Sequence, residues 1–270
     1  MRKVLLLLAG AIVFAANAAA QQNPSTAVPA GAPTQTCPDL SELQKKNDWM
    51  TQRLQDWPDL ARYADANSKL NPPVGNESRV VFMGDSITDG WQNPDMGGFF
   101  PGKPYVDRGI SGQTTPQMLL RFRPDVIALQ PRVVVILAGT NDIAGNTGPE
   151  SLEYIEGNLT SMAELARANH IRVVLASLTP VADITTPEGK NIVQTVRRPP
   201  QQILELNAWI KKFTAGHGDV YLNYFPATAD DKGFFKRQLT NDGLHPNAAG
   251  YAVMAPLAEK AIQEALAKKE

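Results

Sequence analysis

The sequence predicts an α/β fold in which a doubly wound, five-stranded parallel sheet is covered by helices on both faces. Three observations lead to this prediction. From residue 77 onward, short runs rich in valine, isoleucine and leucine alternate with longer segments of helical periodicity. The short runs are apolar throughout, which is typical of parallel strands buried on both faces. No internal repeat is present, so the alternation builds one main domain.

Five strands and four long helices follow from these two patterns. We expect the strands at residues 80–83, 105–107, 133–137, 171–176 and 220–224. We expect the helices at residues 115–129, 151–168, 201–214 and 247–268. Together these elements form a main domain of residues 76–270, in which helices alternate with strands as a doubly wound sheet requires.

The residues ahead of the first strand divide into three segments. Residues 39–75 carry two stretches with apolar residues at helical spacing, interrupted at Trp57-Pro58. We expect this helical N-terminal extension to pack on the outside of the main domain. Residues 21–38 are rich in proline, alanine, threonine and glutamine, a composition typical of a flexible leader. In residues 1–20, two basic side chains, an apolar run and an A-x-A site match a secretory signal peptide.

This signal peptide predicts export. Its apolar run, residues 4–16, is shorter than the ~20 residues that cross a bilayer as a helix. We therefore expect cleavage near Ala20 and release without stable membrane insertion, into the periplasm or the exterior. An oxidising compartment permits disulfides, but the single cysteine, Cys37, cannot form one within the chain.

Charge and histidine content exclude several classes of function. Lysine and arginine number 26 and aspartate and glutamate 27, which leaves a net charge of −1 and no electrostatic footprint for nucleic acid. The three histidines show no clustered spacing with cysteine or aspartate of the kind that binds metals. We therefore predict no nucleic-acid partner, no metal and no cofactor, and the oligomeric state is left open.

Chemically active residues follow four of the expected strands. Ser86 comes directly after the first strand, Gly109 after the second and Asn141 after the third. Asp242 and His245 follow the fifth strand after a loop. In open parallel sheets, ligands bind at the carboxyl ends of the strands, near the point where the strand order reverses. We therefore expect these five residues to meet at one edge of the sheet.

These residue types together can catalyse acyl transfer. A serine hydroxyl attacks an ester only with a base in hydrogen-bond reach, and His245 can supply that base to Ser86. Asp242 can hold the other imidazole nitrogen and stabilise the imidazolium that forms. The tetrahedral intermediate needs hydrogen-bond donors for its oxyanion. We expect these from the backbone N–H groups of Ser86 and Gly109 and from the side-chain amide of Asn141.

Four short blocks of the sequence resemble the SGNH hydrolases, also called the GDSL esterase/lipase family. The blocks are FMGDSITDGW, RGISGQTT, ILAGTNDI and TNDGLHPNAAGY, and they occur in this order. The four initials of the family name fall on Ser86, Gly109, Asn141 and His245. Ile87 stands where the name GDSL has leucine, which is a conservative departure. The resemblance extends from residue 77 to the C-terminus and implies a flavodoxin-like three-layer α/β/α sandwich and ester hydrolysis by a serine nucleophile.

A simpler structural role is available for each candidate. Ser86 could cap the helix that follows the first strand, since serine is common at that position. Asp242 and Asn141 could each shape a turn. The occurrence of all candidates in register with the strands favours the catalytic interpretation. Asp85 we interpret as a local hydrogen-bonding residue.

We therefore expect an exported serine esterase that forms an acyl-enzyme and acts on a small-molecule or glycan ester. Residues 180–202 and 225–238 are polar and should line the substrate rim, with Arg197 and Arg198 as candidate contacts. Because neither stretch offers a long apolar surface for a fatty acyl chain, we expect short acyl groups, including acetyl groups on a glycan. Two alternatives stay open: acyl transfer to a sugar hydroxyl, and a non-catalytic carbohydrate-binding protein on the same fold.

Overall fold

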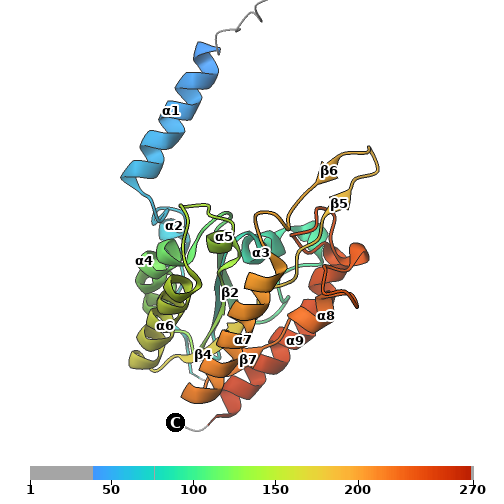
Figure 1. The fold of residues 1–270 in the computed structure, drawn as a ribbon. Coiled ribbons are helices and arrows are strands. Elements are labelled where there is room, and N and C mark those ends of the chain that lie inside the picture. The colour runs from blue at the N-terminus through green and yellow to red at the C-terminus, as the bar shows by residue number, and fades with distance from the viewer. Residues whose placement is uncertain (1–38, 76, 269–270) are drawn as a thin grey trace, which may run out of the picture. The chain divides into compact units, whose positions relative to one another are not determined.

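The computed structural model describes residues 39–75 and 77–268, and a five-stranded parallel sheet lies at its centre (Figure 1). The order of the strands is β2-β1-β3-β4-β7, and every neighbouring pair is parallel. The order reverses at β1, which lies between β2 and β3, as in flavodoxin-like doubly wound sheets. The predicted fold class is confirmed. The strands are β1 (Val80–Gly84), β2 (Tyr105–Gly109), β3 (Val133–Leu137), β4 (Arg172–Ala176) and β7 (Val220–Leu222).

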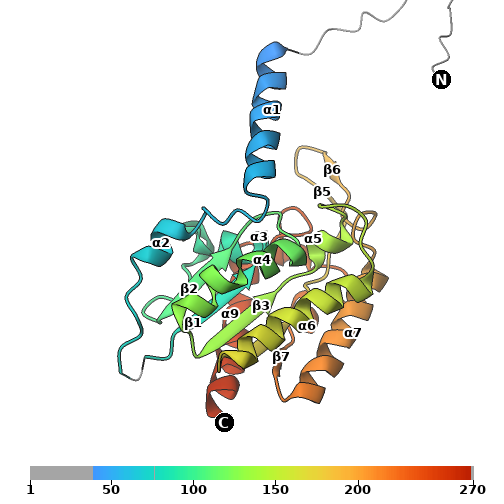
Figure 2. The same ribbon diagram turned by 90° about the vertical axis from the view of Figure 1, so that its left-hand side faces the viewer.

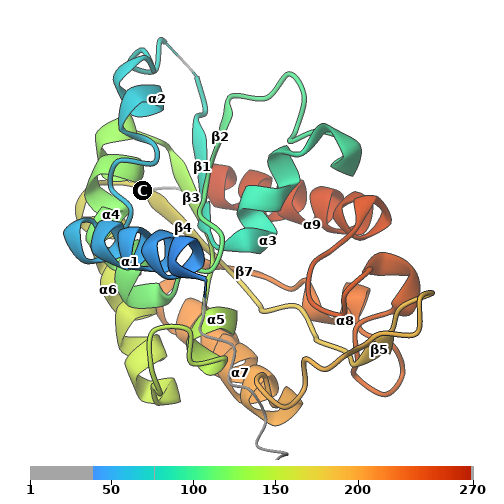
Figure 3. The same cartoon turned by 90° about the horizontal axis from the view of Figure 1, so that it is seen from above.

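Helices cover both faces of the sheet (Figures 2 and 3). All residues of β1 and β3 are buried between these layers, which explains why their sequences are apolar without alternation. The helix expected at residues 115–129 is shorter than predicted, because α4 ends at Asp125 and a separate 3₁₀ turn, Ile127–Leu129, follows it. One face carries α4 (Thr115–Asp125), α6 (Leu152–Ala168) and α7 (Pro200–His217), and the other carries α9 (Ala248–Ala267).

Short elements gather at the carboxyl ends of the strands. Figure 1 shows α3, α5 and the β5–β6 pair at the same end of the sheet. Each is too short to produce a periodicity of its own, so the sequence did not predict them. These elements are α3 (Ser86–Asp89) after β1, α5 (Thr140–Ile143) after β3, the antiparallel pair β5 (Ile184–Thr185) and β6 (Asn191–Ile192) after β4, and α8 (Phe225–Thr228) after β7. The further 3₁₀ turns are Gly90–Gln92, Pro94–Met96 and Arg237–Leu239.

The described part of the N-terminal extension contains α1 (Leu40–Gln55) and α2 (Ala64–Ser68), in agreement with its predicted helical character. None of the side chains of α1 is buried. Tyr63 just before α2 is 6% exposed. The described residues from 45 to 268 belong to one compact unit. The predicted signal peptide and leader, residues 1–38, lie outside the described residues. Within the described ranges, no helix combines the length and the apolar composition that crossing a membrane requires.

Candidate active site

The first helix after β1 begins with Ser86, two residues after Gly84 ends the strand. The carboxylate of Asp85 caps this helix, because its Oδ1 accepts a hydrogen bond from the N–H of Ile87 at 2.9 Å. Ser86 is therefore not the cap, and its hydroxyl is available for another role. Asp85 is fully buried, and burial raises its pKa to about 6. The interpretation of Asp85 as a local hydrogen-bonding residue is confirmed.

Ser86, His245 and Asp242 form one hydrogen-bonded chain. Nε2 of His245 lies 2.9 Å from Oγ of Ser86, and Nδ1 of His245 lies 2.6 Å from Oδ2 of Asp242. The His245 side chain is 40% exposed and the Asp242 side chain 36%, so solvent reaches both groups. A hydroxyl next to an imidazole that a carboxylate orients is the arrangement that activates a serine nucleophile. The structure thus brings these three candidate residues together.

Asp242 also shapes the turn that carries His245. Its Oδ1 accepts hydrogen bonds from the N–H of Leu244 at 2.9 Å and from the N–H of His245 at 2.8 Å. Gly243 has a φ of +78°, and a Cβ there would lie 1.9 Å from the carbonyl oxygen of Ala182, so only glycine fits. Burial alone would raise the pKa of Asp242, but the hydrogen bonds from His245 and Leu244 hold it well below its usual range. The carboxylate therefore stays charged beside the imidazole.

Helix α5 presents Asn141, whose side chain is held by two partners. Nδ2 donates to the carbonyl oxygen of Gln113 at 3.0 Å, and Oδ1 accepts a hydrogen bond from Nη2 of Arg198 at 3.2 Å. Asn141 is 3% exposed, and the described residues take only one of the two hydrogens on its Nδ2. The orientation of the amide is therefore fixed, and one N–H is left for another acceptor.

The N–H of Gly109 is not free, and this corrects its predicted role as an oxyanion donor. It donates to Oδ1 of Asp107 at 2.7 Å, and the carbonyl oxygen of Gly109 accepts a hydrogen bond from the hydroxyl of Tyr63. A Cβ at Gly109 would lie 2.1 Å from the backbone nitrogen of Asp89. Glycine at this position therefore lets α3 pack against the end of β2.

The loop after β2 has one backbone donor that is unused, the N–H of Gly112. Every other N–H from residue 109 to residue 115 donates to an acceptor in the described part of the chain. Sequence reasoning overlooked Gly112, because the sequence does not show which of the neighbouring N–H groups already have an acceptor in the folded loop. For the N–H groups of residues 109, 110, 111, 113, 114 and 115, in this order, the acceptors are Oδ1 of Asp107, O of Gly84, Oδ2 of Asp89, O of Ile110, Oε1 of Gln117 and Oδ1 of Asp142.

The two arginines expected at the rim lie in different environments. Arg197 is exposed, and its Nη2 donates to the carbonyl oxygen of Ala144 at 2.9 Å. Arg198 is only 5% exposed, so its expected place on the rim is wrong. Its Nη1 donates to Oε1 of Gln194 at 3.1 Å, while its Nη2 holds Asn141. Arg198 therefore contacts the candidate site from inside the protein.

The two polar segments expected at the rim enclose a cavity of about 710 Å³. The N–H of Ala182, which lines this cavity, donates to the carbonyl oxygen of Gly243 at 2.8 Å. The cavity wall is therefore joined to the turn that holds Asp242 and His245. Charged and aromatic side chains lie together along the lining, which includes Asp183, Thr195, Lys232, Phe234, Phe235 and Arg237.

Within residues 39–75 and 77–268, no group of three or more histidine, cysteine, aspartate or glutamate side chains could hold a metal ion. Two of the three histidines lie outside the candidate site. His217 ends α7, and its Nδ1 lies 2.8 Å from the carbonyl oxygen of Phe213 in the same helix. His170 has a φ of +58° in the turn between α6 and β4. These histidines have structural positions.

Comparison with known proteins finds lipases and esterases that are similar to this chain. The sequence profile of the GDSL-like lipase/acylhydrolase family matches residues 82–253. A crystal structure of a GDSL-like lipase from Bacteroides thetaiotaomicron VPI-5482 aligns with a TM-score of 0.69 and 44% sequence identity. That alignment covers 77% of this chain and 98% of the lipase. An acetylxylan esterase from Geobacillus stearothermophilus is 26% identical over 214 residues, which are 67% of this chain and 92% of that protein.

Proposed function

Because the chain belongs to the GDSL-like lipase/acylhydrolase family, we propose that it is an exported serine esterase with Ser86, His245 and Asp242 as its catalytic triad. The observation that carries the proposal is the hydrogen-bonded chain from Oγ of Ser86 through both nitrogens of His245 to Asp242. Family membership supports a hydrolase that acts on esters. Beyond ester hydrolysis, we propose the identity of the triad, the class of acyl group and the export of the protein.

In the first half of the reaction, Oγ of Ser86 attacks the carbonyl carbon of the ester while Nε2 of His245 takes the hydroxyl proton. The tetrahedral intermediate collapses when His245 returns that proton to the leaving alcohol. The products of this half are the free alcohol and an acyl-enzyme on Ser86. In the second half, His245 takes a proton from water, the hydroxide attacks the acyl carbon, and the carboxylic acid leaves as Ser86 regains its proton.

Asp242 keeps its charge through this cycle. Its pKa lies well below the usual range, since hydrogen bonds from His245 and Leu244 stabilise the carboxylate against the effect of burial. A carboxylate 2.6 Å from Nδ1 stabilises the imidazolium formed in each half-reaction and keeps Nε2 directed at Ser86. Asp242 therefore acts on the imidazole and does not take the proton itself.

Three donors are assigned to the oxyanion: the N–H of Ser86, the N–H of Gly112 and Nδ2 of Asn141. Each of them has a hydrogen that no acceptor among the described residues takes. The amide of Asn141 is fixed before substrate arrives, because Gln113 and Arg198 hold its two ends. Donors that are already oriented stabilise the developing charge without reorganising during the reaction.

The substrate class that we assign is a short-chain acyl ester of a polar alcohol, with acetyl groups on a glycan as the leading case. The cavity beside the triad turn, which the triad side chains themselves do not line, combines carboxylates, cations and two phenylalanine rings, and such a lining can bind a sugar. The relative from Geobacillus stearothermophilus, at 26% identity, is an acetylxylan esterase. The predicted signal peptide supports an extracytoplasmic site of action, where glycan esters are encountered.

A chain-length and acceptor screen tests this function. The purified protein would be assayed with nitrophenyl acetate, butyrate and octanoate and with acetylated xylooligosaccharides, with Ser86→Ala as the matched control. We expect release of acetate from the oligosaccharides and a rate that falls as the acyl chain lengthens. Equal, background hydrolysis by both proteins would indicate a carbohydrate-binding protein, and acetyl groups recovered on added sugar would indicate acyl transfer.

A further inference from the structure

A short segment of the N-terminal extension contacts the loop that supports the oxyanion donors. This segment, residues 57–63, is called the strap below, and it lies outside the region matched by the family profile, residues 82–253. Its main-chain oxygens accept two hydrogen bonds: Nε2 of Gln117 donates to O of Trp57 at 2.7 Å, and Nε2 of Gln113 donates to O of Pro58 at 2.7 Å. The strap is therefore attached to the end of the β2–α4 loop and to the first turn of α4.

The strap also reaches the beginning of the same loop. The hydroxyl of Tyr63, which is 6% exposed, donates to the carbonyl oxygen of Gly109 at the end of β2. Arg62 forms an ion pair with Asp89 of α3 at 3.5 Å, and Asp89 in turn accepts a hydrogen bond from Oγ of Ser111 at 2.6 Å. Contacts from the strap thus bracket the loop of residues 110–114 at both ends.

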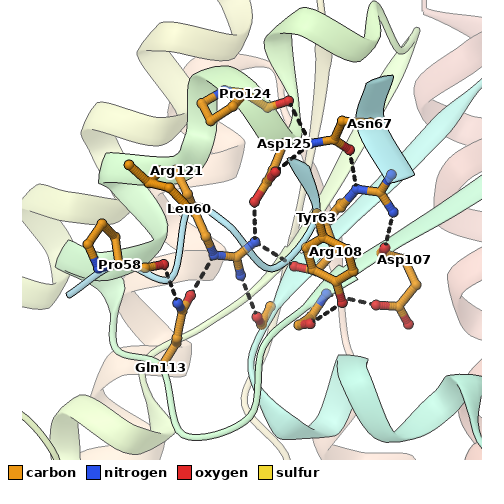
Figure 4. Close-up of polar contacts among 12 residues, drawn as sticks. Pro58, Leu60, Tyr63, Asn67, Asp107, Arg108, Gln113, Arg121, Pro124 and Asp125 are labelled. Carbon is orange, nitrogen blue, oxygen red and sulfur yellow. Dashed lines mark hydrogen bonds and ion pairs between the residues drawn. The ribbon is translucent and has the colours of Figure 1, made fainter. Parts of the chain in front are cut away.

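Gln113 connects this strap to the core of the protein. Its side chain is fully buried, and its Oε1 accepts a hydrogen bond from Nε of Arg121 while its Nε2 holds Pro58 (Figure 4). Arg121 is itself fixed, because its Nη2 donates to O of Gly84 at 3.0 Å and its Nη1 forms an ion pair with Asp125 at 3.1 Å. The position of the Gln113 side chain is therefore set by the strap on one side and by α4 on the other.

The main chain of Gln113 passes this constraint to the candidate site. Its carbonyl oxygen accepts the hydrogen bond from Nδ2 of Asn141 at 3.0 Å. A single residue thus separates the strap from the amide that is assigned to the oxyanion. If Gln113 moves, the hydrogen on Nδ2 that is left for the substrate must point elsewhere, since Nδ2 and its two hydrogens lie in the plane of one rigid amide group.

We propose that the strap is a positioning element of the active site, which holds Gln113 so that Asn141 keeps its amide directed at the oxyanion. The proposal rests on the proposed function, because it takes Asn141 as an oxyanion donor. It gives the N-terminal extension a role in the chemistry. Residues 57–63 touch neither the triad nor the substrate in this role, and they act through the β2–α4 loop that carries Gln113. Gln113 is accordingly a positioning residue.

A double-mutant cycle tests this proposal. Gln113→Glu keeps an acceptor for Arg121 but loses the donor to Pro58, so it removes this contact with the strap while leaving the core contact in place. A misplacement of about 1 Å at a catalytic group costs on the order of 10²-fold in rate. We therefore expect Gln113→Glu to lower kcat by roughly 10-fold to 10²-fold with KM nearly unchanged. In the Asn141→Ala background, the same change should lower kcat by less than about 2-fold.

Two further variants complete the design. Tyr63→Phe removes the strap's contact with Gly109 by deleting one oxygen, and it should lower kcat in the same way if Gln113→Glu folds poorly. Asn67→Ala is the matched control: Asn67 belongs to α2, and it contacts Asp125 at 2.7 Å and Arg108 at 2.8 Å without reaching the β2–α4 loop. It should lower Tm while kcat stays within about 2-fold of wild type.

The outcomes separate this proposal from the esterase function. A fall in kcat for Gln113→Glu that persists undiminished without the Asn141 amide overturns the strap's role, and so does a fall in Tm with no change in kcat. If Asn141→Ala retains wild-type kcat while Ser86→Ala is inactive, the strap's role fails and the esterase function stands. Hydrogen–deuterium exchange of residues 110–114 gives a readout that needs no turnover. It should increase in Gln113→Glu and Tyr63→Phe, and unchanged protection in both overturns the proposal.

Discussion

Oγ of Ser86 and Nε2 of His245 lie 2.9 Å apart, although 159 positions separate the two residues in the sequence. Ser86 follows β1, which has a neighbour on each side in the sheet, whereas His245 lies beyond β7, the strand at one edge. Their contact depends on the width of the sheet between these strands. His245 and Asp242, in contrast, belong to one turn, so their mutual geometry is local. A movement of this turn therefore changes chiefly the distance from the imidazole to the serine.

The nucleophile is tested with a fluorophosphonate, which reacts covalently with activated serines. We expect one label per chain, located on Ser86, because its hydroxyl is the one hydrogen-bonded to His245. Ser86→Ala should be unlabelled and inactive, with an unchanged Tm. Ser111→Ala is the control: Ser111 lies at the same edge, but its Oγ donates to Asp89, and this variant should still be labelled. Labelling of Ser86→Ala at another residue would show that the assignment is mistaken.

The proposed oxyanion role of Asn141 predicts a kinetic signature. The contact gains its full strength only when the oxygen carries full charge, so it contributes little to substrate binding. Asn141→Ala should lower kcat by ~10²–10³-fold with KM nearly unchanged. Asn141→Asp should be at least as slow, because a carboxylate repels the developing charge.

The neighbouring Asp142→Asn is the control for Asn141, since an asparagine can still accept the hydrogen bond that Oδ1 of Asp142 receives from the N–H of Thr115 at 2.9 Å. It should change kcat much less. Steady-state kinetics and thermal unfolding of Asn141→Ala, Asn141→Asp and Asp142→Asn would distinguish a catalytic role of Asn141 from a structural one. A wild-type kcat combined with a lower Tm in Asn141→Ala would make this residue a turn former only.

Arg198 and Arg197 should differ in their effects. Arg198 donates to Oδ1 of Asn141 from a buried position, so Arg198→Met should lower kcat by roughly 10-fold through loss of the amide's orientation. Arg198→Lys should recover little, because an ammonium cannot bridge Asn141 and Gln194 as the guanidinium does. Arg197→Ala should instead alter the preference among acyl and leaving groups. Indistinguishable kinetic profiles for Arg198→Met and Arg197→Ala would contradict this distinction.

The buried carboxyl of Asp107 predicts a pH-dependent stability. Burial raises its pKa to about 7, against about 3.9 for an aspartate in an unfolded chain. The folded protein then binds the proton more tightly than the unfolded chain. The stabilisation from this proton is complete below about pH 4 and is lost as the pH rises through about 7.

Asp107→Asn removes this titration while keeping an acceptor for the N–H of Gly109. The free energy of unfolding of the wild type, minus that of Asp107→Asn, should fall between pH 4 and 7 by up to about 1.4 kcal/mol per pH unit. Urea unfolding at a series of pH values measures this difference. A difference that does not vary with pH would show that Asp107 titrates alike in both states.

The sheet and the contact between Asp242 and His245 could be predicted from the sequence because their signals are local. Apolar runs such as Val133–Leu137 indicate buried parallel strands. Asp242 and His245 are three residues apart, so one turn contains both. The place of Arg198 could not be predicted in this way. It follows Arg197 in a polar stretch, and only the path of the chain after β6 carries it under Asn141.

The donor at Gly112 was missed for a related reason. The N–H of Gly109 donates to Asp107, two residues earlier, and this hydrogen bond cannot be predicted from the glycine alone. A hydrogen-bond inventory of the folded loop was needed to find the free group. The contacts of residues 57–63 are hidden in the same way, since those made by Gln113 and Gln117 link parts of the chain more than fifty residues apart.

The strap's use of main-chain oxygens has an evolutionary consequence. The groups that Gln113 and Gln117 recognise are the carbonyls of Pro58 and Trp57, which every amino acid carries. Substitutions in the strap that preserve its backbone path leave these two hydrogen bonds intact, so residues 57–61 are free to diverge, whereas the side-chain contacts of Arg62 and Tyr63 are not. Inheritance of this role among related chains would therefore be traced by the two glutamine donors and by the tyrosine at position 63, while the rest of the strap changes.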